Sequence, residues 1–109
     1  MSTGIEILLR EKIERTIFSP VSDEEFDREI LWLSEVRNYH DLGGIGKGYI
    51  EKRISKDSPQ KYTSFCILKQ VGLITEEGDN YRLTDEGLRV HSSLVKEGVY
   101  GRFASLVLP

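Results

Sequence analysis

The stretch that decides the fold is YTSFCILKQVGLI, residues 62–74, which is followed by YRLTDEG, residues 81–87. In the first stretch Phe65 and Leu68 have the spacing of one helix face, and Gly72 stands where a helix would end in a left-handed residue. After this glycine the hydrophobic period changes from that of a helix to that of a strand. A short hairpin with the tight-turn sequence GDN then leads into the second stretch. The sequence therefore predicts a helix that is followed at once by a β-hairpin.

Apolar spacing and capping signals predict more helices on both sides of this unit. Ser22 followed by Glu25 has the spacing of a capping box. Ser58 is a candidate N-cap, and Pro59 would take the first helical position after it. The expected helices span residues 5–18, 23–39, 46–55, 59–71 and 85–98, the last of them begun by Thr84 or Asp85.

The fold class expected from this order is mainly α with a small antiparallel β-hairpin, an α+β fold. A length of 109 residues suggests a single domain. We divide it into an N-terminal helix and linker (1–22), a core (23–97) and an apolar C-terminal tail (98–109). Apolar side chains in the tail should not stay in water, so we expect the tail to pack on the N-terminal helix or to form a subunit contact.

Charge is unevenly distributed along the chain. The net charge is −5 over residues 1–41, +4 over residues 42–75 and −2 over residues 76–109. A basic middle between acidic flanks indicates one patch with an anionic partner, although such swings also arise by chance in small domains. No apolar run approaches the length of about 18 residues that a membrane span needs. With a single cysteine and a charged N-terminus, the chain is expected to be cytoplasmic.

The glycine-rich segment LGGIGKGY, residues 42–49, does not match a nucleotide-binding loop. A P-loop needs Ser or Thr after its Gly-Lys pair, and Gly48 stands there instead. The dinucleotide fingerprint fails because Tyr49 takes the place of its third glycine. We expect these glycines to connect two helices. We expect no catalytic residues, no cofactor and no metal site, since His40 and His91 lie far apart in the sequence and no metal-ligand spacing surrounds them.

The predicted order of elements resembles the winged helix-turn-helix fold. Transcription regulators such as the MarR and PadR groups have a recognition helix that ends like Leu68–Ile74 here, and a wing that ends like Tyr81–Gly87. The resemblance covers about two thirds of the chain. It implies that 23–97 is a winged-helix core in which a short edge strand precedes the third helix and pairs with the wing. Extra helices at the two ends would flank this core.

A winged-helix fold implies that helix 59–71 enters the major groove of double-stranded DNA. Gln can read adenine, Lys can read guanine, and Ser or Thr can contact bases or backbone. Basic residues around the helix would neutralise phosphates, with Lys69 among them. The predicted DNA-binding residues are Lys47, Lys52, Arg53, Lys56, Ser58, Gln60, Lys61, Thr63, Ser64 and Arg82.

The turn of the expected wing is acidic, which keeps a second interpretation open. Glu76, Glu77 and Asp79 lie where DNA-binding wings usually carry Arg or Lys, and Arg82 alone is basic there. The expected function is therefore DNA binding and transcription regulation, and the alternative is a protein-interaction module that does not bind DNA. A homodimer through the N-terminal helix and the C-terminal tail would present two recognition helices to a palindromic site.

Overall fold

The computed structural model describes residues 4–57 and 59–103, with all of their side chains except those of 53–63 and 102. The chain is mainly helical with a small three-stranded antiparallel sheet. The boundaries of the predicted helices are confirmed to within one or two residues. The elements are α1 (Gly4–Ile17), α2 (Asp23–Asn38), η1 (His40–Leu42, a 3₁₀ helix), β1 (Ile45–Gly46), α3 (Lys47–Asp57), α4 (Pro59–Val71), β2 (Ile74–Glu77), β3 (Asn80–Leu83), α5 (Asp85–Lys96) and η2 (Val99–Phe103, a 3₁₀ helix).

The predicted helix starts are made by local capping. The Ser22 side chain accepts a hydrogen bond from the backbone N–H of Glu25 at 3.1 Å, which confirms this half of the predicted capping box. Thr84 is the N-cap of α5, and its hydroxyl accepts a hydrogen bond from the Gly87 N–H at 3.0 Å. Pro59 is the first residue of α4, where its missing N–H costs nothing.

The hairpin forms as predicted, and a further strand is added to it. Gly72 ends α4 with φ of +90°, and β2 and β3 pair in the register that places Glu76 opposite Tyr81. β1 pairs antiparallel with β3, with Ile45 opposite Tyr81, so the strand order is β1-β3-β2. β3 is therefore the central strand of the sheet.

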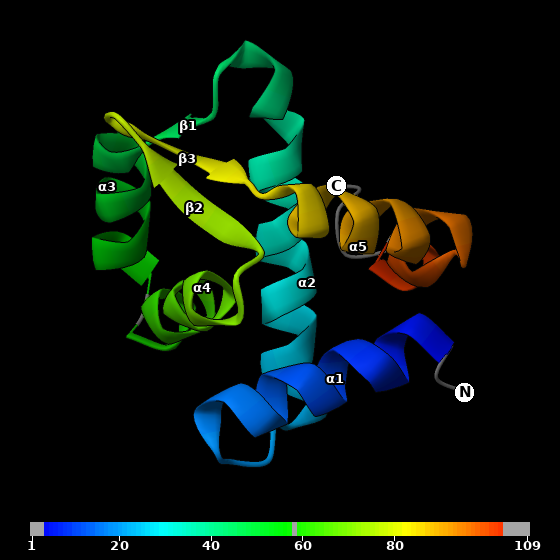
Figure 1. Cartoon of the computed structure of the whole chain (residues 1–109). Coiled ribbons are helices and arrows are strands. Elements are labelled where there is room, and N and C mark those ends of the chain that lie inside the picture. Colours follow the sequence, from blue (N-terminus) through cyan, green and yellow to red (C-terminus); the bar gives the residue numbers. More distant parts are fainter. Residues whose placement is uncertain (1–3, 58, 104–109) are drawn as a thin grey trace.

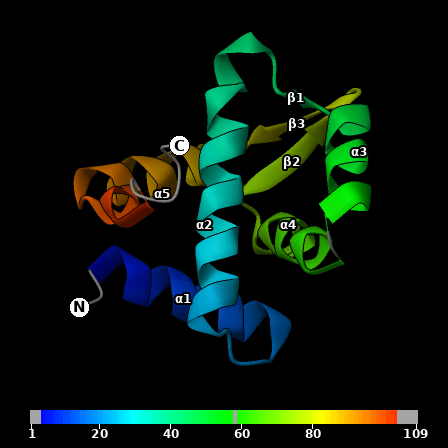
Figure 2. The same ribbon diagram turned by 180° about the vertical axis from the view of Figure 1, so that it is seen from behind.

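α2 is the central helix of the molecule (Figures 1 and 2). The sheet, α3 and α4 lie on one side of α2, and α5 lies on the other side. α1 crosses close to the N-terminal end of α2 and packs against both α4 and α5. Because α1 reaches two elements on opposite sides of α2, it is part of the same packed unit.

The core confirms the apolar positions that identified the central unit. Phe65, Leu68 and Leu73 are buried, as are Leu9 and Ile13 of α1. Burial of apolar surface of this kind is the main favourable term in folding. The largest fully buried side chains of α2, β1, α3 and α5 complete the core: Phe26, Ile30, Leu33, Val36, Ile45, Ile50 and Leu94.

The described part of the C-terminal tail packs on its own chain. Val99 and Phe103 are buried, and the Tyr100 hydroxyl donates a hydrogen bond of 2.7 Å to the carbonyl oxygen of Ile30 in α2. The Tyr100 ring also lies 5.3 Å from the ring of His91 in α5, measured between centroids. These described tail residues contact α2 and α5 within their own chain, and the expected subunit contact stays a prediction. Residues 104–109 lie outside the described part.

Candidate nucleic-acid interface

The residues predicted to contact DNA belong to α3, α4, β3 and the α3–α4 connection. Lys47 is the first residue of α3, Lys52 is an exposed residue of the same helix, and Arg82 lies in β3. Ser58 lies outside the described residues. The side chains of five further predicted residues also lie outside the described part of the chain: Arg53, Lys56, Gln60, Lys61 and Thr63.

Ser64 does not lie on an exposed reading face. It is 2% exposed, like the neighbouring core residues of α4. The helical period places Ser64 on the same side as Leu68 and Val71, which are also buried. The prediction that Ser64 contacts DNA is therefore wrong for this structure, because its side chain faces the interior.

Two lysines from different helices converge on one carboxylate of the hairpin. Lys47 Nζ lies 2.9 Å from Glu76 Oε2, and Lys69 Nζ lies 2.8 Å from Glu76 Oε1. Each carboxylate oxygen therefore has its own ammonium partner. We call Lys47, Lys69 and Glu76 the two-lysine cluster. It joins the start of α3, the last turn of α4 and strand β2.

The ring of Tyr81 lies beneath the two ammonium groups of the two-lysine cluster. The ammonium groups of Lys47 and Lys69 lie 5.8 Å and 5.2 Å from its ring centroid, within the range of cation–π attraction. The ring of Phe65 packs edge-on against Tyr81 with centroids 4.8 Å apart, and so ties it to the core. Glu76 is directly opposite Tyr81 in the hairpin, which places both side chains on one face of the sheet.

These contacts shift the pKa values of the three charged groups in the two-lysine cluster. Hydrogen bonds from Lys69 and Lys47, followed by their charges, lower the pKa of Glu76 to about 2. The hydrogen bond to Glu76 also raises the pKa of both lysines above the ordinary value. All three groups are therefore ionised at neutral pH, and one carboxylate is shared between two positive charges.

Arg82 faces the opposite side of the hairpin. Side chains alternate along a strand, so Arg82 points away from the face that carries Tyr81. Its guanidinium pairs with Glu77 at 2.9 Å and approaches the carbonyl oxygen of His40 at 3.5 Å. The structure therefore does not bring Arg82 together with Lys47, although both were predicted to contact DNA.

Sequence reasoning missed the role of Tyr81 and the pairing of the lysines. Glu76 and Tyr81 lie at matching distances from the turn, so a fixed hairpin register would have paired them. No local signal joins Lys47 to Lys69, because they belong to different helices.

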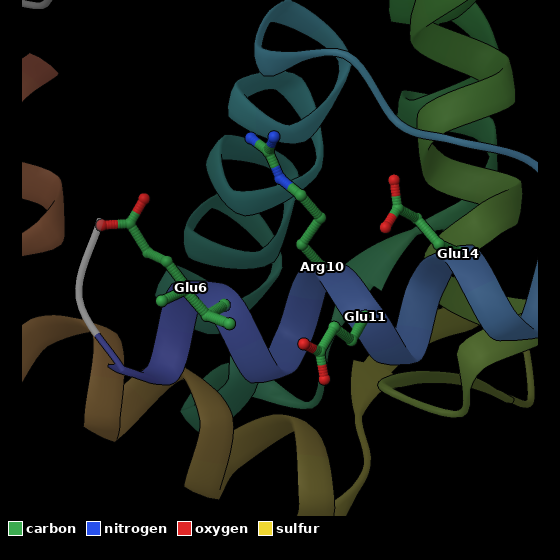
Figure 3. Close-up of a pocket in the computed structure, with 5 residues that line it drawn as sticks. Glu6, Arg10, Glu11 and Glu14 are labelled. Carbon is green, nitrogen blue, oxygen red and sulfur yellow. The ribbon is translucent and has the colours of Figure 1, made fainter. Parts of the chain in front are cut away.

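A second candidate site is a pocket lined by residues of α1. Its volume is about 270 Å³, and Figure 3 shows Glu6, Arg10, Glu11 and Glu14 around it. Arg10 is already occupied, since it pairs with Asp23 at 2.7 Å and lies over the Phe26 ring. The remaining charged lining is acidic, which does not suit a phosphate ligand. The fifth lining residue is Ile7.

No group of three His, Cys, Asp or Glu side chains that could hold a metal ion is present among the described residues. None of the helices in residues 4–57 and 59–103 is long and apolar enough to cross a membrane. Comparisons of this chain with family models, with curated proteins and with solved structures give no match.

Proposed function

We propose that this chain is a winged helix-turn-helix protein that binds double-stranded DNA and regulates transcription. The observation that carries the proposal is the arrangement of elements: α2, β1, α3, α4 and the β2–β3 hairpin follow in that order, and β1 pairs with β3. This arrangement agrees with the edge strand and wing that the sequence resemblance implies. A DNA-binding role also agrees with the expectation of a cytoplasmic protein.

In this proposal α4 is the recognition helix. One residue separates it from the end of α3, and its apolar side chains Phe65 and Leu68 hold it against the core. The early residues of such a helix reach the base edges in the major groove. Gln60, Lys61 and Thr63 would read the bases, and Lys52, Arg53 and Lys56 of α3 would contact phosphates.

The direct test is fluorescence anisotropy of a labelled random-sequence duplex at several salt concentrations. We expect binding that weakens steeply with salt, since counterions are released when lysines contact phosphates. Lys61→Glu should lower the affinity by roughly tenfold or more, because it replaces a positive charge at the start of the proposed recognition helix with a negative charge that repels the phosphates. Lys96→Glu is the matched control: it makes the same charge change on an exposed residue of α5. Absence of binding by the folded protein at low salt would contradict the proposal.

A protein-interaction module remains the second candidate because of the acidic hairpin. Glu76 pairs with Lys47 and Lys69, and Glu77 pairs with Arg82, so two hairpin carboxylates already offset much of the charge of these three cations. A surface whose positive charge is largely offset attracts DNA less strongly than a free basic patch. If the duplex titration shows no binding, this candidate becomes the better interpretation.

The proposed regulator is a homodimer, and α1 supplies the best described surface for it. Ile7, Leu8 and Phe18 are exposed large apolar side chains, Phe18 to 94% and with a left-handed backbone (φ 56°). Exposed Glu11 and Arg15 lie on the same side of the helix. The described tail residues pack against their own chain, so the proposed dimer contact is made by α1.

Charge complementarity selects a second copy as the partner of this surface. If two α1 helices pair antiparallel about a two-fold axis, Glu11 can face Arg15 of the partner subunit, and the symmetry repeats this pair. The same register brings Leu8 to the C-terminal end of the partner's α1, where exposed Phe18 follows the last helical residue. One antiparallel alignment therefore brings together both the charged and the apolar side chains on the exposed side of α1.

A further inference from the structure

The two-lysine cluster has the form of an occupied anion site. Two ammonium groups hold the two oxygens of one carboxylate at 2.9 and 2.8 Å. The occupant is supplied by the hairpin itself, since Glu76 is a residue of β2. A phosphodiester also presents two anionic oxygens to its ligands, and lysine is a common partner of phosphate.

The cluster is held in place before any ligand binds. Phe65 packs edge-on against Tyr81, and Tyr81 lies under both ammonium groups. The backbone N–H of Lys47 donates a hydrogen bond of 2.9 Å to the carbonyl oxygen of Asp79, which fixes the start of α3 against the turn of the hairpin. The positions of the two ammonium groups therefore depend on the core and the hairpin as well as on Glu76.

Solvent reaches the cluster. The side chains of Lys47 and Lys69 are about one third exposed, and that of Glu76 is about half exposed. A second anion can therefore approach the lysines from outside without unfolding any element. The carboxylate can turn away into water, because it belongs to a flexible side chain at the surface.

Resting on the proposed function, we propose that Lys47 and Lys69 form a backbone-phosphate site for DNA and that Glu76 is its internal competitor. The tethered carboxylate occupies the site in the free protein, and a phosphate of the duplex displaces it on binding. Glu76 thus weakens DNA binding and limits it to duplexes whose other contacts compensate for the displacement. This role explains why an acidic residue occupies a wing position where basic residues are usual.

The test uses the complete chain and a labelled random-sequence duplex, and compares the wild type with Glu76→Gln. In the wild type a phosphate must displace Glu76 before it reaches the lysines, whereas in Glu76→Gln both lysines are free for it. Glu76→Gln should therefore bind the duplex more tightly than the wild type, by roughly threefold or more, because two exposed ion pairs no longer have to be broken. Glu51→Gln is the control, because it removes an equal charge from an exposed residue of α3.

Two double variants assign the effect to the lysines. Adding Lys47→Gln or Lys69→Gln to Glu76→Gln should each remove most of this gain in affinity, because the phosphate then loses one of its two ammonium partners. Circular dichroism of every variant checks that the fold is kept.

The outcomes separate this inference from the proposed function. If the wild type binds and Glu76→Gln has the same affinity, the competitor role is overturned and the DNA-binding proposal stands. Binding by Glu76→Gln alone supports the competitor role, with the wild type held in its self-occupied form. If neither protein binds at low salt, both proposals are overturned. An equal gain in Glu51→Gln would also overturn the competitor role, because net charge would then explain the effect.

Discussion

Glu29 is a carboxyl group in the interior of the molecule. It is fully buried in α2, and neither of its oxygens has a hydrogen-bond partner among the described residues. Burial, together with the charge of Glu25, raises its pKa from 4.5 to about 7, while Arg28 and Arg10 act in the opposite direction. The unfolded chain ionises near pH 4.5 and the folded chain only near pH 7. The free energy of unfolding should therefore fall as the pH rises from 4.5 to 7.

The substitution Glu29→Gln should remove this pH dependence. Gln is close in shape to the protonated side chain and never ionises, so it avoids the cost of a buried charge. At pH 8 we expect the variant to be more stable by roughly 1–3 kcal/mol, from about 1.4 kcal/mol per pKa unit. At pH 4.5 the difference should be near zero. Urea unfolding at both pH values measures it, with Glu51→Gln as an exposed control. Parallel pH profiles for wild type and Glu29→Gln would contradict the prediction.

At the scale of elements, backbone packs closely against backbone where the hairpin meets α5. The Thr84 hydroxyl donates a 2.6 Å hydrogen bond to the carbonyl oxygen of Gly72 and also caps α5. A Cβ added at Gly87 would lie 2.2 Å from the carbonyl oxygen of Leu73. The start of α5 therefore approaches the end of α4 so closely that only glycine fits.

Replacing Gly87 by Ala should destabilise the protein, although alanine is the better helix former. The clash is with backbone, which cannot rotate aside, so α5 must shift and the cost should be about 1–3 kcal/mol. Gly48→Ala is the matched control, because Gly48 is helical in α3 and a Cβ there meets nothing within 4 Å. That variant should gain up to about 1 kcal/mol. Thermal unfolding by circular dichroism compares them, and a rise in Tm for Gly87→Ala would contradict the prediction.

The elements were predictable from sequence because their signals are local. Ser22, Pro59 and Gly72 each act within a few residues, through a cap, a fixed φ or a left-handed helix end. The orientation of Ser64 could not be predicted from sequence, since it depends on how α4 is rotated against α2. A polar residue on a buried face carries no sign of its burial in the sequence.

At the scale of the whole molecule, folding pairs charges that the sequence places in different segments. The basic segment 42–75 suggested a free patch, but the fold brings Glu76 from the next segment onto Lys47 and Lys69. Lys47 lies 29 residues from Glu76 in the chain, and Lys69 is separated from Glu76 by the segment boundary, so a sum over segments finds neither pair. The candidate site was therefore located by sequence only to the level of the helices involved.

The proposed dimer also belongs to this scale, and exchanging its charges tests it. Glu11→Arg or Arg15→Glu alone would place like charges opposite each other twice across the two-fold axis, and should weaken the dimer by roughly tenfold or more. The double exchange of Glu11→Arg with Arg15→Glu restores opposite charges and should restore the dimer, a recovery that a merely destabilised helix would not show. Sedimentation velocity measures the association of all four proteins. A wild type that stays monomeric, or a double variant as weak as the single ones, would contradict this pairing of α1.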